Sequence, residues 1–488
     1  MDSGLGLAKF LFPQIPSLAN TALLHTLGKT PTSSKWDLRT TLTVQVLRQM
    51  MNGKPQSISR AQTTTLKDPG VKGKTWVANA TIKAPEQQDE GLREAVFDAI
   101  EAMQPEDAGV LNYTKPTLAD TEVEWTGFRP DAGEKDPMPD ISEQEKYTKM
   151  MSEPSRKSET TILYFHGGAY YLCDPSTHRP IVSRLAKECN GRVCSVRYRL
   201  APQTAFPGQL LDALLVYLSL IYPPPGSMHD AVPAKNIVFS GDSAGGNLVF
   251  ALLQFILQLH RTSGNPKVLF YGKEVEVPLP AGACANSGWL DVSRSMASIE
   301  SNAGYDYLPP PDFDAGYTSR FPKDDVWPTN PPRGDLFCDL SLLDHPLVSP
   351  LAADSWKNSP PMWLCTGQEM LTDEDTIVAF RAATQGVSVH YEEYEAMPHV
   401  FAMLLPALPA ADRCLRGWGD FCRRCVDESE SVKTDGKYIY AKTGKEESIP
   451  VEGATTISLV EARQVMKTVK ERRIKAFDAE NTKTKSAL

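Results

Sequence analysis

Long hydrophobic runs are missing from this 488-residue sequence, and with them the usual signature of a membrane-spanning helix. The first 30 residues are mildly apolar, but Lys9, Pro13 and Pro16 interrupt them. No basic segment followed by a small-residue cleavage site marks a signal peptide there. We therefore expect neither a transmembrane span nor a secretory signal, and an amphipathic segment lying on a membrane surface stays open as an alternative.

Long runs of one charge sign are missing as well. Lys and Arg total 51, Asp and Glu total 60, and the formal net charge is −9. Because a phosphate backbone is bound by clustered positive charge, this balance argues against nucleic acid as a partner. Apolar residues make up 41% of the chain and charged residues 23%, which is typical of a globular protein with a buried core.

The nine cysteines show no disulfide framework, since their number is odd and their spacing irregular. Such usage is typical of a reducing compartment and predicts a cytoplasmic protein. Cys422 and Cys425, in CRRC, form the one close pair, and a pair without a second pair does not make a zinc site. We expect two thiols on a helix there, and we expect neither a metal nor an organic cofactor.

Strand-like and helix-like segments alternate from about residue 160 onward. Short β-rich runs such as TTILYF, RVCSVRY, KNIVFS, PPMWLC and VSVHYEEY are separated by helical patterns such as GQLLDALLVYLSLIY and NLVFALLQFILQLHR. This alternation predicts an α/β fold in which helices flank a mostly parallel central sheet. The predicted α/β domain covers about residues 120–425.

Two regions outside this alternation are predicted to form a cap over the α/β domain. An insertion at about 290–345 is rich in prolines and aromatics, and a long irregular insertion in a compact domain is usually functional. Residues 1–60, with the predicted helix KWDLRTTLTVQVLRQMM, form the other part of the cap. Residues 430–488 are predicted to be a charged C-terminal extension that ends in an amphipathic helix and a loose tail.

The segment FSGDSAGGNLVF places Ser243 between Gly241 and Gly245. A G-x-S-x-G pattern after a strand and before a helix is a nucleophile elbow, a strained turn whose neighbours must be small. The alternative, a serine that only caps a helix, explains neither the two glycines nor the apolar flanks. The pattern therefore predicts Ser243 as a nucleophile.

A serine hydroxyl needs a base, and the elbow order places an acid and then a histidine downstream. His399, in MPHVF, follows a predicted strand and is the predicted base. The other three downstream histidines are expected to have structural roles: His260, His345 and His390. The predicted acid is Glu369, in the loop after MWLC. Asp373 is the alternative acid, although a carboxylate in the first turn of a helix also has a structural reason, the helix dipole.

Backbone N–H groups are needed to stabilise the oxyanion that forms when a serine attacks an acyl carbon. FHGGAYY, after the first strand of the α/β alternation, offers the amides of Gly168 and Ala169, and Ala244 follows the nucleophile. His166 is predicted to order this loop. Four aromatic residues are predicted to line an apolar substrate pocket, the alternative being that such aromatics only pack the cap on the core: Tyr170, Trp289, Tyr305 and Tyr307.

Taken together, HGGAYY, YRLAP, GDSAGGNL and PHVF resemble the motifs of the hormone-sensitive-lipase branch of the α/β-hydrolase fold. That branch includes fungal carboxylesterases, steryl acetyl hydrolases, arylacetamide deacetylases and the non-catalytic plant gibberellin receptors. The resemblance implies a Ser/acid/His ester hydrolase with a capped acyl pocket and no cofactor, with 120–425 as its catalytic domain.

By position, the resemblance implies Ser243 as the nucleophile and His399 as the base, with Gly167, Gly168 and Ala169 at the oxyanion hole. Two residues depart from the family pattern. Ala169 replaces the third glycine of HGGG, and Glu369 replaces the usual aspartate.

The sequence as a whole predicts a serine esterase or deacetylase that cleaves short- to medium-acyl esters of a bulky small molecule through an acyl-enzyme. An acyltransferase or cyclase with the same triad is the alternative, because the first half-reaction is the same. A receptor-like binding protein is disfavoured, because such receptors have replaced the histidine that stands here as His399.

Overall fold

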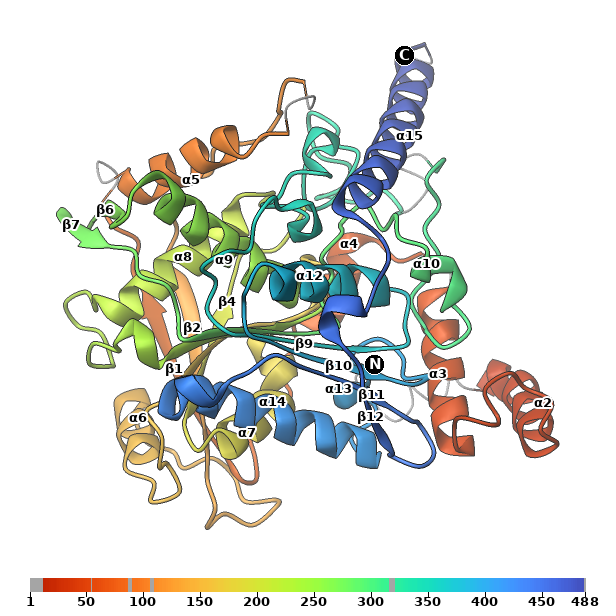
Figure 1. The fold of residues 1–488 in the computed structure, drawn as a ribbon, viewed down its shortest axis with the longest axis horizontal. Helices are drawn as coiled ribbons and strands as arrows, with labels where there is room; N and C mark the ends of the chain where they lie inside the picture. Colours follow the sequence, from red (N-terminus) through yellow and green to blue (C-terminus); the bar gives the residue numbers. More distant parts are fainter. Residues whose placement is uncertain (1–11, 54, 87–89, 106–108, 316–320, 487–488) are drawn as a thin grey trace.

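A large twisted sheet crosses the whole molecule (Figure 1). The computed structural model describes residues 12–486 except 54, 87–89, 106–108 and 316–320. The strands of this sheet are β1 (Thr75–Ile82), β2 (Thr121–Phe128), β3 (Thr161–Phe165), β4 (Arg192–Arg197), β5 (Ile237–Asp242), β8 (Gly282–Asn286), β9 (Met362–Gly367), β10 (Val389–Tyr394), β11 (Asp435–Ile439) and β12 (Glu446–Ser448). A separate hairpin consists of β6 (Lys267–Phe270) and β7 (Lys273–Glu276).

The strands pair in the order β1-β2-β4-β3-β5-β8-β9-β10-β11-β12. All neighbours from β4 to β11 are parallel, and antiparallel pairs close the sheet at both ends. The predicted mostly parallel sheet is therefore confirmed. Because parallel strands end at the same edge, the loops that follow β5, β8, β9 and β10 meet there.

Helices cover both faces of the sheet (Figure 1). Those of the α/β core are α5 (Gly91–Ala102), α6 (Glu143–Met151), α7 (Pro175–Glu188), α8 (Gly208–Ile221), α9 (Ala244–Thr262), α12 (Thr372–Thr384), α13 (Phe401–Leu404) and α14 (Pro409–Asp427). The others are α2 (Ile15–Thr26), α3 (Leu38–Met51), α4 (Ile58–Thr65), α10 (Ser298–Ser301) and α15 (Leu459–Ser486). α5, α8, α9 and α12 lie on one face, and α6, α7 and α14 lie on the other.

Two hydrophobic clusters fill the space between the sheet and these helix layers. Strands β3, β5 and β9 are buried at every position, which explains their continuous apolar sequences. α9 is buried on all sides over its first 14 residues, from Ala244 to Leu257, because the sheet covers one side and neighbouring helices the other. The sequence predicted this position from its apolar character all round.

The sheet extends beyond both ends of the predicted 120–425 domain. β1 pairs with β2 at one edge, and β11 and β12 add two strands at the other. Residues 430–488 are therefore partly built into the core, which the prediction of an appended extension did not anticipate. β11 and β12 lie at one end of the sheet and contain many polar residues, so their sequences lack the alternating apolar pattern that predicts a strand.

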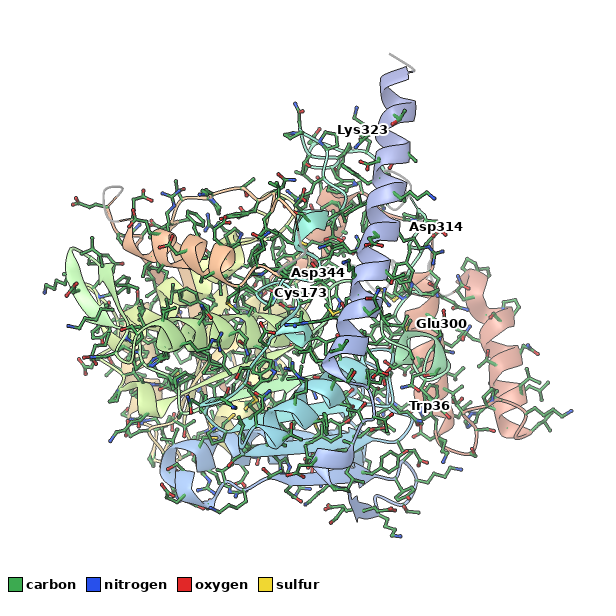
Figure 2. All side chains as sticks on the ribbon, turned by 45° about the horizontal axis from the view of Figure 1, so that its top comes forward. Trp36, Cys173, Glu300, Asp314, Lys323 and Asp344 are labelled. Carbon is green, nitrogen blue, oxygen red and sulfur yellow. The ribbon has the colours of Figure 1, made fainter. Side chains whose placement is uncertain are left out.

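The expected loose tail is also corrected, because α15 continues to Ser486 and packs on the insertion. Lys470 Nζ lies 2.6 Å from Asp344 Oδ1, and this ion pair is largely buried. Arg472 pairs with Asp314, which Figure 2 shows beside α15. Within the part of the chain that the structure describes, no helix combines the length and apolar character needed to cross a membrane.

Candidate functional site

Ser243 lies between β5 and α9, at the edge of the sheet where the parallel strands end. Its φ of 52° and ψ of −121° define a strained backbone conformation that residues other than glycine rarely adopt. A Cβ on Gly241 would lie 2.5 Å from the carbonyl carbon of Gly245, and one on Gly245 would lie 1.9 Å from Phe165 O. The backbone approaches so closely that only glycine fits on either side of the serine.

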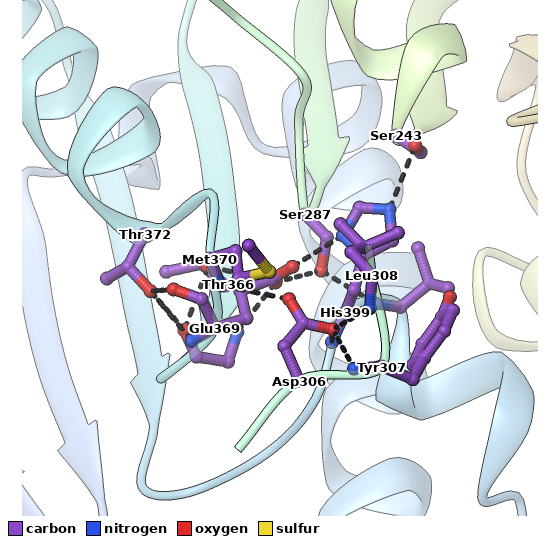
Figure 3. Close-up of polar contacts among 12 residues, drawn as sticks. Ser243, Ser287, Asp306, Tyr307, Leu308, Thr366, Glu369, Met370, Thr372 and His399 are labelled. Carbon is purple, nitrogen blue, oxygen red and sulfur yellow. Dashed lines mark hydrogen bonds and ion pairs between the residues drawn. The ribbon is translucent and has the colours of Figure 1, made fainter. Parts of the chain in front are cut away.

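His399 and Glu369 complete a hydrogen-bonded chain with Ser243 (Figure 3). His399 Nε2 is 2.9 Å from Ser243 Oγ, and His399 Nδ1 is 2.5 Å from Glu369 Oε2. Glu369 follows β9 and His399 follows β10, so the parallel sheet brings the two loops to the nucleophile. The structure thus brings together the three residues that the sequence predicted.

The second carboxylate oxygen of Glu369 is held by the surrounding core. Ser287 Oγ donates a short hydrogen bond to Oε1, Thr366 Oγ1 lies 3.0 Å from the same atom, and the Gly367 amide donates to it at 3.1 Å. Glu369 is fully buried. These contacts fix Oε1 and leave Oε2 directed at the imidazole, so the extra methylene relative to aspartate is accommodated.

The alternative acid, Asp373, lies in the first turn of α12 and does not reach the imidazole. Its Oδ2 accepts a hydrogen bond from the Ser298 amide at 2.8 Å. The other downstream histidines also have local partners: His260 with Val277 O, His345 with Ile100 O, and His390 with Glu392. The geometry therefore favours Glu369 and His399 over each alternative considered from the sequence.

The charge distribution makes His399 a stronger base than an ordinary histidine. Burial by itself would lower its pKa, but the charge and hydrogen bond of Glu369, with the charges of Asp306 and Asp242, outweigh burial and raise the pKa. A raised pKa means that the imidazole binds a proton more readily, as a base that must accept the serine proton requires.

The loop after β3 presents backbone donors beside the nucleophile. Gly168 and Ala169 both have positive φ, at 112° and 51°, and their amides have no hydrogen-bond partner among the described residues. Ala244 is the first residue of α9, where backbone N–H groups lack helical partners. This arrangement agrees with the three predicted oxyanion donors.

Gly167 does not belong with these donors, and that prediction is corrected. Its amide donates to Asp242 Oδ1 at 3.1 Å and is thereby occupied. Tyr164 Oη donates to the same oxygen at 2.6 Å, and His178 Nε2 lies 3.4 Å from the other. His166 orders the loop as predicted, with Nδ1 2.7 Å from Gly167 O; burial, with the charge of His178, lowers its pKa to about 3.

The four aromatic residues that were predicted to bind substrate differ in how they lie relative to Ser243 and His399. Tyr170 is fully buried, its ring stacks on Phe337 at 3.8 Å, and its hydroxyl donates to Asn247, so it packs against the core. The Tyr307 ring lies 6.2 Å from the His399 ring. Trp289, half-buried, donates its amide to Ser243 O at 3.0 Å.

Tyr305 contacts the N-terminal region rather than the nucleophile. Its ring meets that of Trp36 edge-on at 6.4 Å. The Trp36 indole donates to Ala396 O at 2.6 Å, near the loop that carries His399. Tyr305 therefore connects the insertion to the N-terminal region, which is the packing role that the sequence left open as an alternative.

Three polar residues of the site were missed by sequence analysis: Ser287, Asp306 and Thr366. Ser287 follows β8, a strand of small residues that lacks a strand-like pattern. Asp306 lies in the irregular insertion, where no periodicity points to burial. Thr366 is the penultimate residue of β9, and its position shortly before the acid was the one signal that could have revealed it.

Metal-ligating side chains are not grouped at the site. Among the residues that the structure describes, no three His, Cys, Asp or Glu side chains lie together so as to hold a metal ion. Cys422 and Cys425 lie on α14, and Cys422 Sγ is 3.6 Å from Cys284 Sγ in the core.

Comparison with known proteins identifies the fold and the class of enzyme. Residues 162–403 match a family model described as the alpha/beta hydrolase fold. An acetyl-hydrolase of Streptomyces hygroscopicus is 28% identical over 276 residues, covering 56% of this chain and 79% of the relative. An esterase of Acinetobacter venetianus is 28% identical over 262 residues, covering 53% and 73%.

The solved structures agree on the fold. The crystal structure of an esterase from the bacterial hormone-sensitive lipase family matches with a TM-score of 0.51 at 21% identity, covering 80% of this chain and 99% of that one. The family match runs from β3 into α13 and so includes the elements that carry Ser243, Glu369 and His399. Residues 162–403 therefore have the α/β-hydrolase fold, and the chain is a serine hydrolase of the carboxylesterase type.

Proposed function

We propose that this enzyme cleaves short- to medium-acyl esters of a bulky small molecule through an acyl-enzyme on Ser243. The observation that carries the proposal is the hydrogen-bonded chain from Ser243 Oγ through His399 to Glu369, with the amides of Gly168 and Ala169, which have no hydrogen-bond partner among the described residues. The acetyl-hydrolase and esterase named among the relatives agree with this reaction class. No metal or organic cofactor takes part in the proposed mechanism.

In the first half-reaction, Ser243 Oγ attacks the acyl carbon while His399 Nε2 takes the hydroxyl proton. Glu369 Oε2 keeps Nδ1 protonated and stabilises the imidazolium that forms. The amides of Gly168, Ala169 and Ala244 receive the developing oxyanion. His399 then gives its proton to the leaving alkoxide, and the alcohol departs.

In the second half-reaction, water replaces the alcohol. His399 removes a proton from the water, whose oxygen attacks the acyl carbon and breaks the bond to Ser243 Oγ. The proton returns to the serine and the carboxylic acid leaves. The experiment that tests this half-reaction uses ¹⁸O-labelled water: hydrolysis places the label in the acid product, whereas transfer to another alcohol or amine leaves it in the water.

The acyl chain accepted is expected to be short. The insertion and the N-terminal region lie against the His399 loop, and His399 is only 3% exposed, so we propose a bounded acyl pocket. For p-nitrophenyl esters, kcat/KM should fall steeply between about C4 and C10, because each methylene contributes roughly 0.8 kcal/mol only where space exists to bury it. Turnover should persist in chelator, and efficient cleavage of long-chain triglyceride emulsions would contradict the bounded pocket.

The pH profile should reflect the raised pKa of His399. The imidazole must be neutral to accept the serine proton, so activity is lost as pH falls through that pKa. The acid limb of kcat/KM should therefore have its midpoint above about 6.5, the ordinary histidine value. His260→Gln, at the far end of α9, is the control and should leave the limb in place; a wild-type midpoint below the ordinary value would argue against the Glu369 contact in solution.

The remaining elements of the proposal concern the surroundings of the enzyme. All nine cysteines are free thiols, which agrees with the proposed cytoplasmic location. The proposed partner is a small-molecule ester, and nucleic acid is not expected to bind an acidic chain with mixed surface charge.

A further inference from the structure

Asp306 is a second buried carboxylate beside the Glu369–His399 pair, and it comes from the insertion rather than from the core. Asp306 is only 1% exposed. The charged groups that act on it are Glu369, His399 and the guanidinium of Arg48 on α3. The mechanism above does not use this carboxylate.

The two oxygens of Asp306 connect separate loops of the site (Figure 3). Oδ2 accepts a hydrogen bond from the Met370 amide at 2.9 Å, one residue after Glu369. Oδ1 accepts from the Tyr307 amide at 2.7 Å and from the His399 amide at 3.4 Å. One side chain therefore links the acid loop, the base loop and the insertion.

The backbone of the same residue is held from the N-terminal region. Arg48 Nε donates to Asp306 O at 2.7 Å, and Arg48 Nη2 donates to Gly304 O at 2.6 Å. α3 thus contacts the segment that carries Asp306. The N-terminal region, the insertion and the loops that carry Glu369 and His399 therefore meet at Asp306.

Placing a second carboxylate next to Glu369 is unfavourable for the fold. Burial and then the charge of Glu369 raise the pKa of Asp306, which means that its ionised form is destabilised there. A neutral side chain would avoid this electrostatic cost. Only a carboxylate offers two acceptor oxygens without any donor, as these converging N–H groups require.

We propose that Asp306 is a positioning residue that fixes the acid loop against the His399 loop and couples both to the covering insertion. The inference rests on the proposed function, because it assumes that Ser243, His399 and Glu369 carry the reaction. Asp306 acts through backbone amides and through its charge near the imidazole, and it does not itself touch the reacting atoms.

The test compares Asp306→Asn with wild type in kcat, KM, melting temperature and the pH dependence of kcat/KM on one soluble p-nitrophenyl ester. Asparagine would direct a donor group at N–H groups, so kcat should fall about 10- to 100-fold while KM changes little. The acid limb should move to lower pH, because one of the charges that favours the imidazolium is lost. A purely structural role would leave that limb unchanged.

Asp324→Asn is the matched control. Asp324 is also an insertion carboxylate that accepts backbone amides, from Trp327 at 2.8 Å and from Ser59 in the N-terminal region at 2.8 Å. No hydrogen bond within the described residues joins it to His399 or Glu369. Asp324→Asn should therefore keep both kcat and the acid limb of wild type.

Two further variants make each result decisive. Asp306→Glu keeps the charge but lengthens the side chain, and should lower kcat with the acid limb in place; it also serves if Asp306→Asn does not fold. Wild-type kcat in Asp306→Glu, or wild-type kcat and acid limb in Asp306→Asn, would overturn the inference. Ser243→Ala is assayed alongside: if it retains hydrolysis, the proposed function has failed, whereas an inactive Ser243→Ala with unaffected Asp306 variants refutes only the role of Asp306.

Discussion

Ser243→Ala is expected to lower kcat for ester hydrolysis by on the order of 10⁴- to 10⁶-fold, because the attacking oxygen is removed while the fold is kept. His399→Ala should cost a similar factor, since the hydroxyl loses the base 2.9 Å from its oxygen. The double variant should lose little more than either single variant, because the two residues act as one unit. Steady-state kinetics on p-nitrophenyl butyrate give all three values.

Covalent labelling checks the same assignment without relying on turnover. A fluorophosphonate should modify wild type at Ser243, found by peptide mapping, and should not modify Ser243→Ala. Ser263→Ala, at the far end of α9 and exposed, serves as the control and should keep full activity and labelling. Near-wild-type hydrolysis by Ser243→Ala would refute the nucleophile assignment.

Glu369→Gln is expected to lower kcat on the order of 10⁴-fold, the size associated with losing tautomer control in a serine-protease triad. Ser287, Thr366 and the Gly367 amide would hold the amide oxygen in the place of Oε1. The amide nitrogen would then face His399 Nδ1 and favour the tautomer that is protonated on Nε2. An imidazole in that state cannot accept the serine proton.

Asp373→Asn provides the matched comparison, since it removes a carboxylate four residues along the same segment. Its loss should cost about 0.3 to 1 kcal/mol of stability through the weakened helix-dipole interaction, with activity retained. Both variants are compared by melting temperature and by kcat on one soluble ester. If Asp373→Asn were inactive and Glu369→Gln active, the acid would be Asp373 and the observed contact of Glu369 would have no catalytic role.

Local chemistry explains how far the sequence could predict this site. The Ser243 turn is specified within five residues, because the close backbone approach at Gly241 and Gly245 excludes any side chain. Glu369 and His399 could be predicted because each follows a strand that the sequence revealed, β9 as an apolar run and β10 as a β-rich run. Gly167 was assigned wrongly because no pattern in HGGAYY shows that the Asp242 carboxylate occupies its amide.

Elements without local signals were found only in the folded chain. β8 consists of the small residues Gly282–Asn286, yet it lies at the centre of the sheet between β5 and β9 and ends at Ser287, which supports Glu369. β11 and β12 are the last two strands at one end of the sheet and carry polar residues, so their sequences resembled an appended tail. Their strand state comes from pairing with β10 and with each other.

The sequence by itself determined the α/β class and the nucleophile elbow, since both depend on residues close together in the chain. The tertiary structure decided which carboxylate meets His399, which amides remain free, and that Asp306 from the insertion lies beside the acid. These contacts join residues 30 to 156 positions apart, such as Glu369 with His399 and Ser243 with His399. Residues so far apart in the sequence come into contact only because the parallel strands bring their loops to one edge of the sheet. The periodicity of the sequence does not show which of these loops meet.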